Sequence, residues 1–272
     1  LAYDHAATAA DGTISGATWT TSDLPIQTDI TTGVWIASAG GRWSDPANWL
    51  GRVLPQGDGS VAYFTNTPPQ ALTVTNDLST LLLGQWRVNS PVGFTFEGNS
   101  VTMTNGLSSA RVVSTNGSHT FAVPLIATAK GLFVETTAAS TLALTGVVGG
   151  TGTLSVNPST SGGGVVTLSD ANTYTGATVL GCGTLSIAAL ADGGVASGIG
   201  ASPSASGNLV LGPGTLRYIG SAVVTDRGYT VAAGASPVRA ATLDAEGNVT
   251  FGGQIQATSG AFIKTGPGTV SY

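Results

Sequence analysis

The sequence predicts an all-β fold, a parallel β-helix (β-solenoid) with a Trp-rich N-terminal cap. Three observations lead to this prediction. A Gly-x-Gly-Thr-Leu phrase returns along the chain, short stretches alternate apolar with polar residues, and 40 of the 272 residues are glycine. Helical periodicity is weak throughout: the best helical stretch, 188–191, is followed by Gly193-Gly194, which would end a helix within a turn.

The repeated phrase is the strongest signal. Its first three copies are evenly spaced, and the wider gap before the fourth leaves room for a degenerate copy near 234–237. Glycine permits a tight corner, and Thr-Leu then begins a short strand with alternating faces. Such strands become stable when they stack and bury a shared apolar column. The copies are Gly150–Leu154, Gly181–Leu185, Gly212–Leu216 and Gly266–Val270.

The segment 1–60 differs from the rest of the chain. It contains four of the five tryptophans, namely Trp19, Trp35, Trp43 and Trp49. Bulky aromatic residues suit the end of a solenoid, where the core would otherwise meet water. We therefore predict an N-terminal extension and cap over 1–60 and a solenoid over 61–272, with about 11–13 rungs of roughly 20–25 residues each.

Composition excludes several classes of function. Charged residues make up 8 % of the chain, the formal net charge is −5, and no basic cluster is present, so no nucleic acid partner is expected. No apolar run approaches the ~18–20 residues of a membrane-spanning helix, so no transmembrane segment is expected. The single Cys182 lies between two glycines and is interpreted as a small side chain in a turn.

Candidate catalytic and metal-binding residues are few. The two histidines are His5, near the start of the chain, and His119, which follows Asn116-Gly117-Ser118 and is expected in a surface turn. No His or Cys spacing suits zinc. Asp58 and Asp192 lie in Gly-rich turns and are expected to be solvated, although some β-solenoids bind calcium at such turns.

Polysaccharide lyases and hydrolases also use parallel β-helices, so an enzyme needs separate consideration. The compact candidates are Asp226-Arg227 and Asp244-Ala245-Glu246, and we interpret both as surface turns. The sequence therefore predicts a protein that is not an enzyme, with no catalytic, cofactor-binding or metal residues and no cofactor.

Glycan binding without catalysis is an open alternative, because exposed aromatic rings stack on sugars. Trp43, Trp49 and Trp86 are the candidates, and packing in the core or cap is favoured for each. The two possibilities differ in what a structure should contain. A glycan site predicts a groove with aromatic and acidic side chains, whereas a structural solenoid predicts ladders of Thr, Ser and Ala.

The segments Leu168–Thr178 and Gly181–Leu185 closely resemble the autotransporter-associated β-strand repeat, Leu-Ser-Gly-x-Asn-Thr-Tyr-Thr-Gly-x-Thr followed by x-x-Gly-Thr-Leu. Ile263–Val270 resembles the other half of that repeat, and Trp43–Phe64 resembles the lead-in that often precedes it. Asp170 departs from the pattern, since glycine is usual there. The strongest family signal lies in Asn172 and Tyr174, interpreted as structural, with the tyrosine hydroxyl in water.

The resemblance implies a right-handed parallel β-helix that serves as a stalk in large secreted or outer-membrane-tethered bacterial proteins, and it implies no catalytic residue. We therefore predict an extracellular or cell-surface structural protein, with 61–272 as the autotransporter-type repeat region. One alternative is a carbohydrate-binding or polysaccharide-cleaving β-helix, and another is a fragment of an adhesive autotransporter passenger. Surface glycans would be the partners of a carbohydrate-binding or an adhesive protein.

The chain is also predicted to bind itself as a head-to-tail filament or sheath subunit. The segment Lys264–Tyr272 ends within a repeat, and few charges are present to block pairing of strand edges. The extended segment Gly12–Thr20 is a candidate to pair with the open end of a neighbouring copy.

Overall fold

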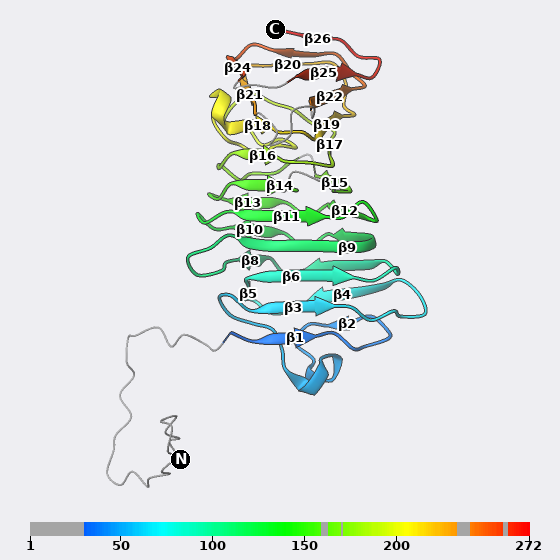
Figure 1. The fold of residues 1–272 in the computed structure, drawn as a ribbon. Coiled ribbons are helices and arrows are strands. Elements are labelled where there is room, and N and C mark those ends of the chain that lie inside the picture. The colour runs from blue at the N-terminus through cyan, green and yellow to red at the C-terminus, as the bar shows by residue number, and fades with distance from the viewer. Residues whose placement is uncertain (1–29, 159–162, 170, 233–239, 258–260) are drawn as a thin grey trace, which may run out of the picture.

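The computed structural model describes residues 30–158, 163–169, 171–232, 240–257 and 261–272. These residues form a column of stacked turns made of parallel strands, so the predicted all-β solenoid is confirmed. In Figure 1 the nearer strands β3, β6 and β11 run from left to right while the chain climbs, which makes the coil right-handed. The predicted segment Gly12–Thr20 lies outside the described residues.

Each turn contributes strands to a first and a second face. Each of these faces has ten parallel strands among the described residues, and the long strand β9 belongs to both. The first face contains β1 (Thr32–Val34), β3 (Val61–Phe64), β6 (Gln85–Asn89), β9 (Ala110–Phe121), β11 (Leu132–Thr136), β14 (Leu154–Val156), β16 (Thr178–Leu180), β18 (Leu209–Leu211), β21 (Tyr229–Val231) and β24 (Ile255–Ala257). The second face contains β2 (Gly41–Arg42), β4 (Leu72–Asn76), β7 (Phe94–Gly98), the end of β9, β12 (Ser140–Leu144), β15 (Val165–Leu168), β17 (Thr184–Ile187), β19 (Thr215–Tyr218), β22 (Ala241–Ala245) and β25 (Phe262–Thr265).

The third face is interrupted. Its lower part is the sheet of β5 (Leu81–Leu83), β8 (Val101–Met103), β10 (Leu125–Ala127) and β13 (Val148–Gly150). Its upper part is the sheet of β20 (Val223–Thr225), β23 (Val249–Phe251) and β26 (Val270–Ser271). Between these two sheets lie the corner around Asn172 and a long loop, 188–208. Some of the described turns therefore have no strand on the third face.

Alternation along each strand builds the core. On the second face, Leu142, Val166, Leu185, Leu216 and Leu243 follow one another in register and are all buried. Burying one such side chain stabilises the fold by about 1.5–3 kcal/mol. Because the same column recurs on every face, the solenoid has one continuous apolar core.

The length of a turn follows from the register. On the first face Val61 pairs with Gln85, and Leu132 pairs with Leu154, so these turns agree with the predicted rung length. The step from Thr178 to its partner Leu209 is longer, because the loop 188–208 is inserted within that turn. This face has ten strands among the described residues, fewer than the predicted 11–13 rungs.

The even spacing of the first three phrases does not correspond to a structural repeat. Only the phrases at Gly181 and Gly212 occupy equivalent corners, between the first and second faces, and Thr184 pairs with Thr215. The phrase at Gly150 joins the third face to the first, and that at Gly266 joins the second face to the third. The phrase therefore marks a sharp corner of any kind. The candidate copy near 234–237 lies outside the described residues.

The Trp-rich cap is present at the lower end of the column. Trp35, Trp43 and Trp49 are buried, and the 3-10 helices η1 (Pro46–Asn48) and η2 (Leu50–Arg52) carry the chain beneath the first turn. Within the predicted cap region, β1 and β2 already stack in parallel on β3 and β4. The helical content of the described residues is otherwise η3 (Ser206–Asn208).

Aromatic packing extends well beyond the cap. Ring contacts link eight buried aromatic residues over the first four turns, with centroid distances from 4.5 to 6.1 Å. We call this set the aromatic cluster: Trp35, Trp43, Trp49, Phe64, Trp86, Phe94, Phe96 and Phe121. Above it, the core is mainly Leu, Val and Ile.

Candidate functional site

The tryptophans considered for glycan stacking are in the core. Trp43, Trp49 and Trp86 are at most 1 % exposed. The indole N–H of Trp43 donates to the carbonyl of Pro55 at 3.2 Å, and that of Trp49 donates to the carbonyl of Trp43 at 2.8 Å. A sugar ring has no access to these faces, so the predicted core and cap packing is confirmed for all three.

Arg227 was predicted in a surface turn, and that prediction was wrong. Its side chain is 1 % exposed and inserts into the loop 188–208. The guanidinium donates to Ser202 Oγ and to four backbone carbonyls of that loop, at 2.8–3.3 Å; the carbonyls belong to Ala191, Asp192, Val195 and Gly200. Burial lowers the pKa of Arg227. This network ties the loop to the next turn.

The neighbouring carboxylates also join that loop to the turn of Arg227. Asp226 Oδ1 accepts from the N–H of Gly193 at 2.7 Å, and Asp192 Oδ1 accepts from the N–H of Asp226 at 2.9 Å. Asp58 behaves alike, since its Oδ1 accepts from Thr104 Oγ1 and from the N–H of Gly106. Asp58 and Asp192 are exposed at turns, as expected, and their carboxylates also join neighbouring segments.

The other acidic candidate forms an ion-pair group on the second face. Arg217 donates to Glu246 at 2.6 Å and lies 3.6 Å from Asp244. All three side chains are partly exposed. The Arg217 guanidinium therefore binds both carboxylates.

His119 was predicted in a surface turn, and this was wrong as well. It lies within β9, in the core column between Phe94 and Leu142, and is 3 % exposed. Its Nδ1 accepts from the N–H of Phe94 at 3.1 Å, so Nε2 carries the proton and donates to the carbonyl of Asn116 at 2.7 Å. Burial lowers the pKa of His119. His5 lies outside the described residues.

Asn172 and Tyr174, which carry the family resemblance, form a buried corner of the third face. Asn172 Oδ1 accepts from the N–H of Val148 at 2.8 Å, while Nδ2 donates to the carbonyls of Ser169 and Gly198. The Tyr174 hydroxyl was expected in water but is buried, 2.7 Å from Thr178 Oγ1. Burial raises the pKa of Tyr174. The side-chain bonds of both residues add to the backbone bonds that this corner makes with β13.

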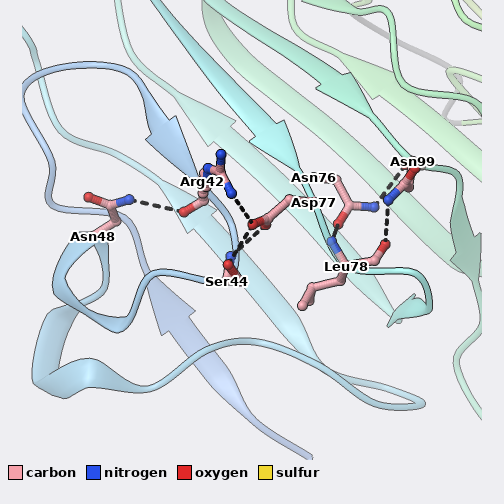
Figure 2. A network of polar contacts seen from close by, with 7 residues as sticks. All are labelled: Arg42, Ser44, Asn48, Asn76, Asp77, Leu78 and Asn99. Atoms are coloured by element: carbon pink, nitrogen blue, oxygen red, sulfur yellow. Dashed lines mark hydrogen bonds and ion pairs between the residues drawn. The ribbon is translucent and has the colours of Figure 1, made fainter.

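A polar network joins the cap to the turns above it (Figure 2). Asp77 accepts from the N–H and hydroxyl of Ser44 at 3.0 and 2.6 Å, and Arg42 lies 3.8 Å away. Burial acts to raise the pKa of Asp77, but the bonds from Ser44 outweigh it and hold the pKa below its ordinary value. Next to it, Asn76 donates to the carbonyl of Asn99, and Asn99 donates to that of Leu78.

The second face carries a ladder of small, mostly hydroxyl-bearing residues on its outer side. The register places one residue from each of six successive turns in the same column, and two charged residues continue it. We call this the hydroxyl ladder: Thr73, Thr95, Thr120, Ala143, Thr167 and Ser186, followed by Arg217 and Asp244. It is the pattern that a structural solenoid predicts.

One open cleft of about 510 Å³ lies at the corner between the first and second faces. Its described lining comes from three successive turns: from β9, from the end of β11 with the corner after it, and from residues 157, 158 and 163, which follow β14. Sequence reasoning missed this cleft, although opposite charges one turn apart, at Arg111 and Glu135, could have indicated it. Its lining residues are Arg111, Val113, Ser114, Thr115, Glu135, Thr136, Thr137, Ala138, Asn157, Pro158 and Gly163.

Two further features of the described residues concern binding. No group of three or more His, Cys, Asp or Glu side chains in the described ranges is placed to hold a metal ion. The short helices of the described chain cannot cross a bilayer. Comparisons of the chain with known protein families, curated proteins and solved structures gave no match.

Proposed function

We propose that this chain is an extracellular structural surface protein, a β-solenoid stalk related to the autotransporter-associated repeats. One observation carries the proposal: the polar residues best suited to chemistry are used to join successive turns. Arg227, His119 and Asn172 each bond backbone groups of neighbouring turns or loops, and the hydroxyl ladder runs along the outer surface.

Surface labelling tests this proposal directly. Antibodies raised against the purified chain should label intact cells of the source organism, and external protease should remove the label. A signal that appears only after the cells are lysed would overturn the surface location.

We further propose that the chain has no catalytic activity on polysaccharides. The support is that Asp226 bonds the backbone of the loop 188–208 and that Arg217 forms an ion pair with Glu246. The measurement is reducing-end release from a panel of acidic and neutral polysaccharides, for which no turnover is expected from the chain or from Asp226→Ala. Turnover that Asp226→Ala abolishes would refute this proposal.

Self-association into a filament or sheath is a separate proposal. Few charges are available on the solenoid to oppose close approach of two copies. At the lower end of the column, η1 and η2 cover the first turn, so a partner would meet the edge of β1 rather than an open core. Electron microscopy should find fibres of the full chain and none after deletion of the segment 1–20; a full chain that stays monomeric at high concentration contradicts the proposal.

A further inference from the structure

We propose that Asn105 is a self-modification site, where the side-chain amide is converted to an aspartyl or isoaspartyl group and Asp58 acts as the general base. Asn105 begins the turn 105–108, at the corner between β8 and β9. The N–H of Ser108 donates to the carbonyl of Asn105 at 2.9 Å and closes this turn. The site is separate from the stalk function, so either proposal can fail while the other stands.

The chemistry depends on the residue that follows an asparagine. The backbone nitrogen of that residue attacks the side-chain Cγ, and glycine allows the closest approach because it has no Cβ. The chain contains two Asn-Gly pairs, Asn105-Gly106 and Asn116-Gly117. The two pairs differ in what the glycine N–H contacts, and this difference selects Asn105.

At the first pair, the glycine N–H contacts a carboxylate. Gly106 N donates to Asp58 Oδ1 at 2.7 Å, within the reach of a general base, about 2.6–3.2 Å. Thr104 Oγ1 donates to the same oxygen at 3.1 Å and helps to fix the carboxylate. At the second pair, Gly117 N donates to the carbonyl of Ala139 at 3.1 Å, and a carbonyl is no base for this proton.

The turn also leaves room for the reaction. A Cβ built on Gly106 would have no atom within 4 Å, and Leu107 at the tip is 92 % exposed. Asn105 Nδ2 donates to the carbonyl of Ser109 at 3.3 Å, a long bond that does little to retain the amide. Gly117, by contrast, lies within β9, where a Cβ would be 2.2 Å from a backbone oxygen.

The reaction is balanced with water as its co-reactant. As Asp58 takes the proton of Gly106 N, that nitrogen attacks Cγ of Asn105, and the new C–N bond closes a succinimide ring. The bond from Cγ to Nδ2 then breaks, and the nitrogen leaves as ammonia with the proton that Asp58 returns. Water opens the ring at either carbonyl, which leaves aspartate or isoaspartate at position 105. Each event adds one negative charge beside Asp58.

The test incubates the full chain near neutral pH and follows both Asn-Gly pairs by peptide mapping and mass spectrometry. Conversion should be faster at Asn105 than at Asn116 in the folded chain. In urea, where Asp58 no longer contacts the turn, the rate at Asn105 should fall to that at Asn116. Asp58→Ser, which removes the carboxylate and keeps a short polar side chain, should slow conversion of Asn105 about tenfold or more.

Two further variants make the result specific. Glu246→Gln removes a partly exposed carboxylate at another corner and should react like the unmodified chain. Asp58→Glu retains a carboxylate and should recover part of the rate, with circular dichroism to establish that each variant is folded. Conversion of Asn105 in Asp58→Ser at the unmodified rate or faster would overturn the proposal. So would a folded chain in which Asn105 reacts no faster than Asn116.

Discussion

Single buried polar residues connect one turn to the next, and Arg227 has the largest set of partners. Its guanidinium donates to the carbonyls of Asp192, Val195 and Gly200 in the loop 188–208. A buried acceptor that loses its donor costs about 1–3 kcal/mol. The loop therefore depends on a residue that belongs to the following turn.

Replacing Arg227 with methionine should lower the free energy of unfolding by about 3 kcal/mol or more, because a similar volume is kept while every donor is lost. Urea unfolding measures the loss, and hydrogen exchange should show loss of protection in 188–202. Arg217→Met, on the exposed second face, should cost less than about 1 kcal/mol. Equal losses in the two variants would contradict this assignment.

His119 should make stability depend on pH below its ordinary pKa. Burial lowers its folded-state pKa, so on acidification the unfolded chain takes up a proton near pH 6.5 before the folded chain does. The free energy of unfolding should therefore fall as the pH drops from about 6.5 to the folded-state pKa. Asp77 has a lowered pKa as well, so its contribution is lost only as the pH falls below its ordinary value of 3.8.

The measurement is urea unfolding of the chain between pH 8 and pH 4.5. His119→Leu should remove this part of the pH dependence, at some cost in stability because the N–H of Phe94 loses its acceptor. His5→Gln is the control and should keep the dependence. An unchanged pH profile in His119→Leu would exclude His119 as its source.

At the scale of elements, glycine is required at corners mainly because the next turn comes close. A Cβ on Gly183 would lie 2.6 Å from the carbonyl oxygen of Gly164, and Gly183 also has a φ of +70°. Gly194 has a φ of +82° with nothing within 4 Å, and Gly207 has neither constraint. Substitutions at these three positions therefore distinguish the cost of a positive φ from the cost of crowding by a neighbouring turn.

Alanine at the three glycines should give a graded series. Gly207→Ala should be close to neutral, and Gly194→Ala should cost about 1 kcal/mol through its positive φ. Gly183→Ala should cost about 2–4 kcal/mol, because crowding adds to the conformational cost. Thermal or urea unfolding gives the order, and a Gly183→Ala variant no less stable than Gly194→Ala would show that the neighbouring turn can move aside.

The sequence was sufficient to predict strands, alternation and the stacked architecture, because each is visible within a few residues. It was misleading about the repeat, because corners of three different kinds use the same Gly-x-Gly-Thr-Leu phrase. The inserted loop 188–208 lengthens the turn between the equivalent corners at Gly181 and Gly212. Their spacing in the sequence therefore equals that between Gly150 and Gly181, which lie at corners of different kinds.

Side-chain environments at corners were harder to predict from sequence. Asn116-Gly117-Ser118 is typical of a surface turn, but β9 continues through this corner, where Gly117 has a φ of +78°, and carries His119 into the core. The hydroxyl of Tyr174 bonds Thr178 and is buried because the loop 188–208 covers that corner, with Thr178 donating to the carbonyl of Ile199. The cleft likewise depends on three turns at once, which no local pattern describes.

At the scale of the whole molecule, strand pairings among the described residues run only between neighbouring turns. The strand pairings of each face connect successive turns, and among the described strands none joins the lower turns directly to the upper ones. In such a stack, stability is a sum of contributions from turns and from the interfaces between them. Distant changes should therefore act independently.

Trp49→Phe in the cap and Phe251→Leu in β23 test this independence. Each should destabilise the chain through lost packing, and the double variant should show a coupling energy below about 0.5 kcal/mol. Trp49→Phe combined with Trp43→Phe is the positive control, because these rings are 4.8 Å apart. A coupling above about 1 kcal/mol between Trp49 and Phe251 would mean that the column behaves as a single cooperative unit.

The aromatic cluster also has a consequence for the order in which the chain acquires its structure. Forming a first turn in isolation is costly, because the chain is closed into a loop before any neighbouring turn is present to pair with it. The eight packed rings compensate for that cost over the first four turns, so we expect them to act as the folding nucleus. Each later turn then adds to a finished edge, and burial of tryptophan should precede completion of the β-sheet signal during refolding.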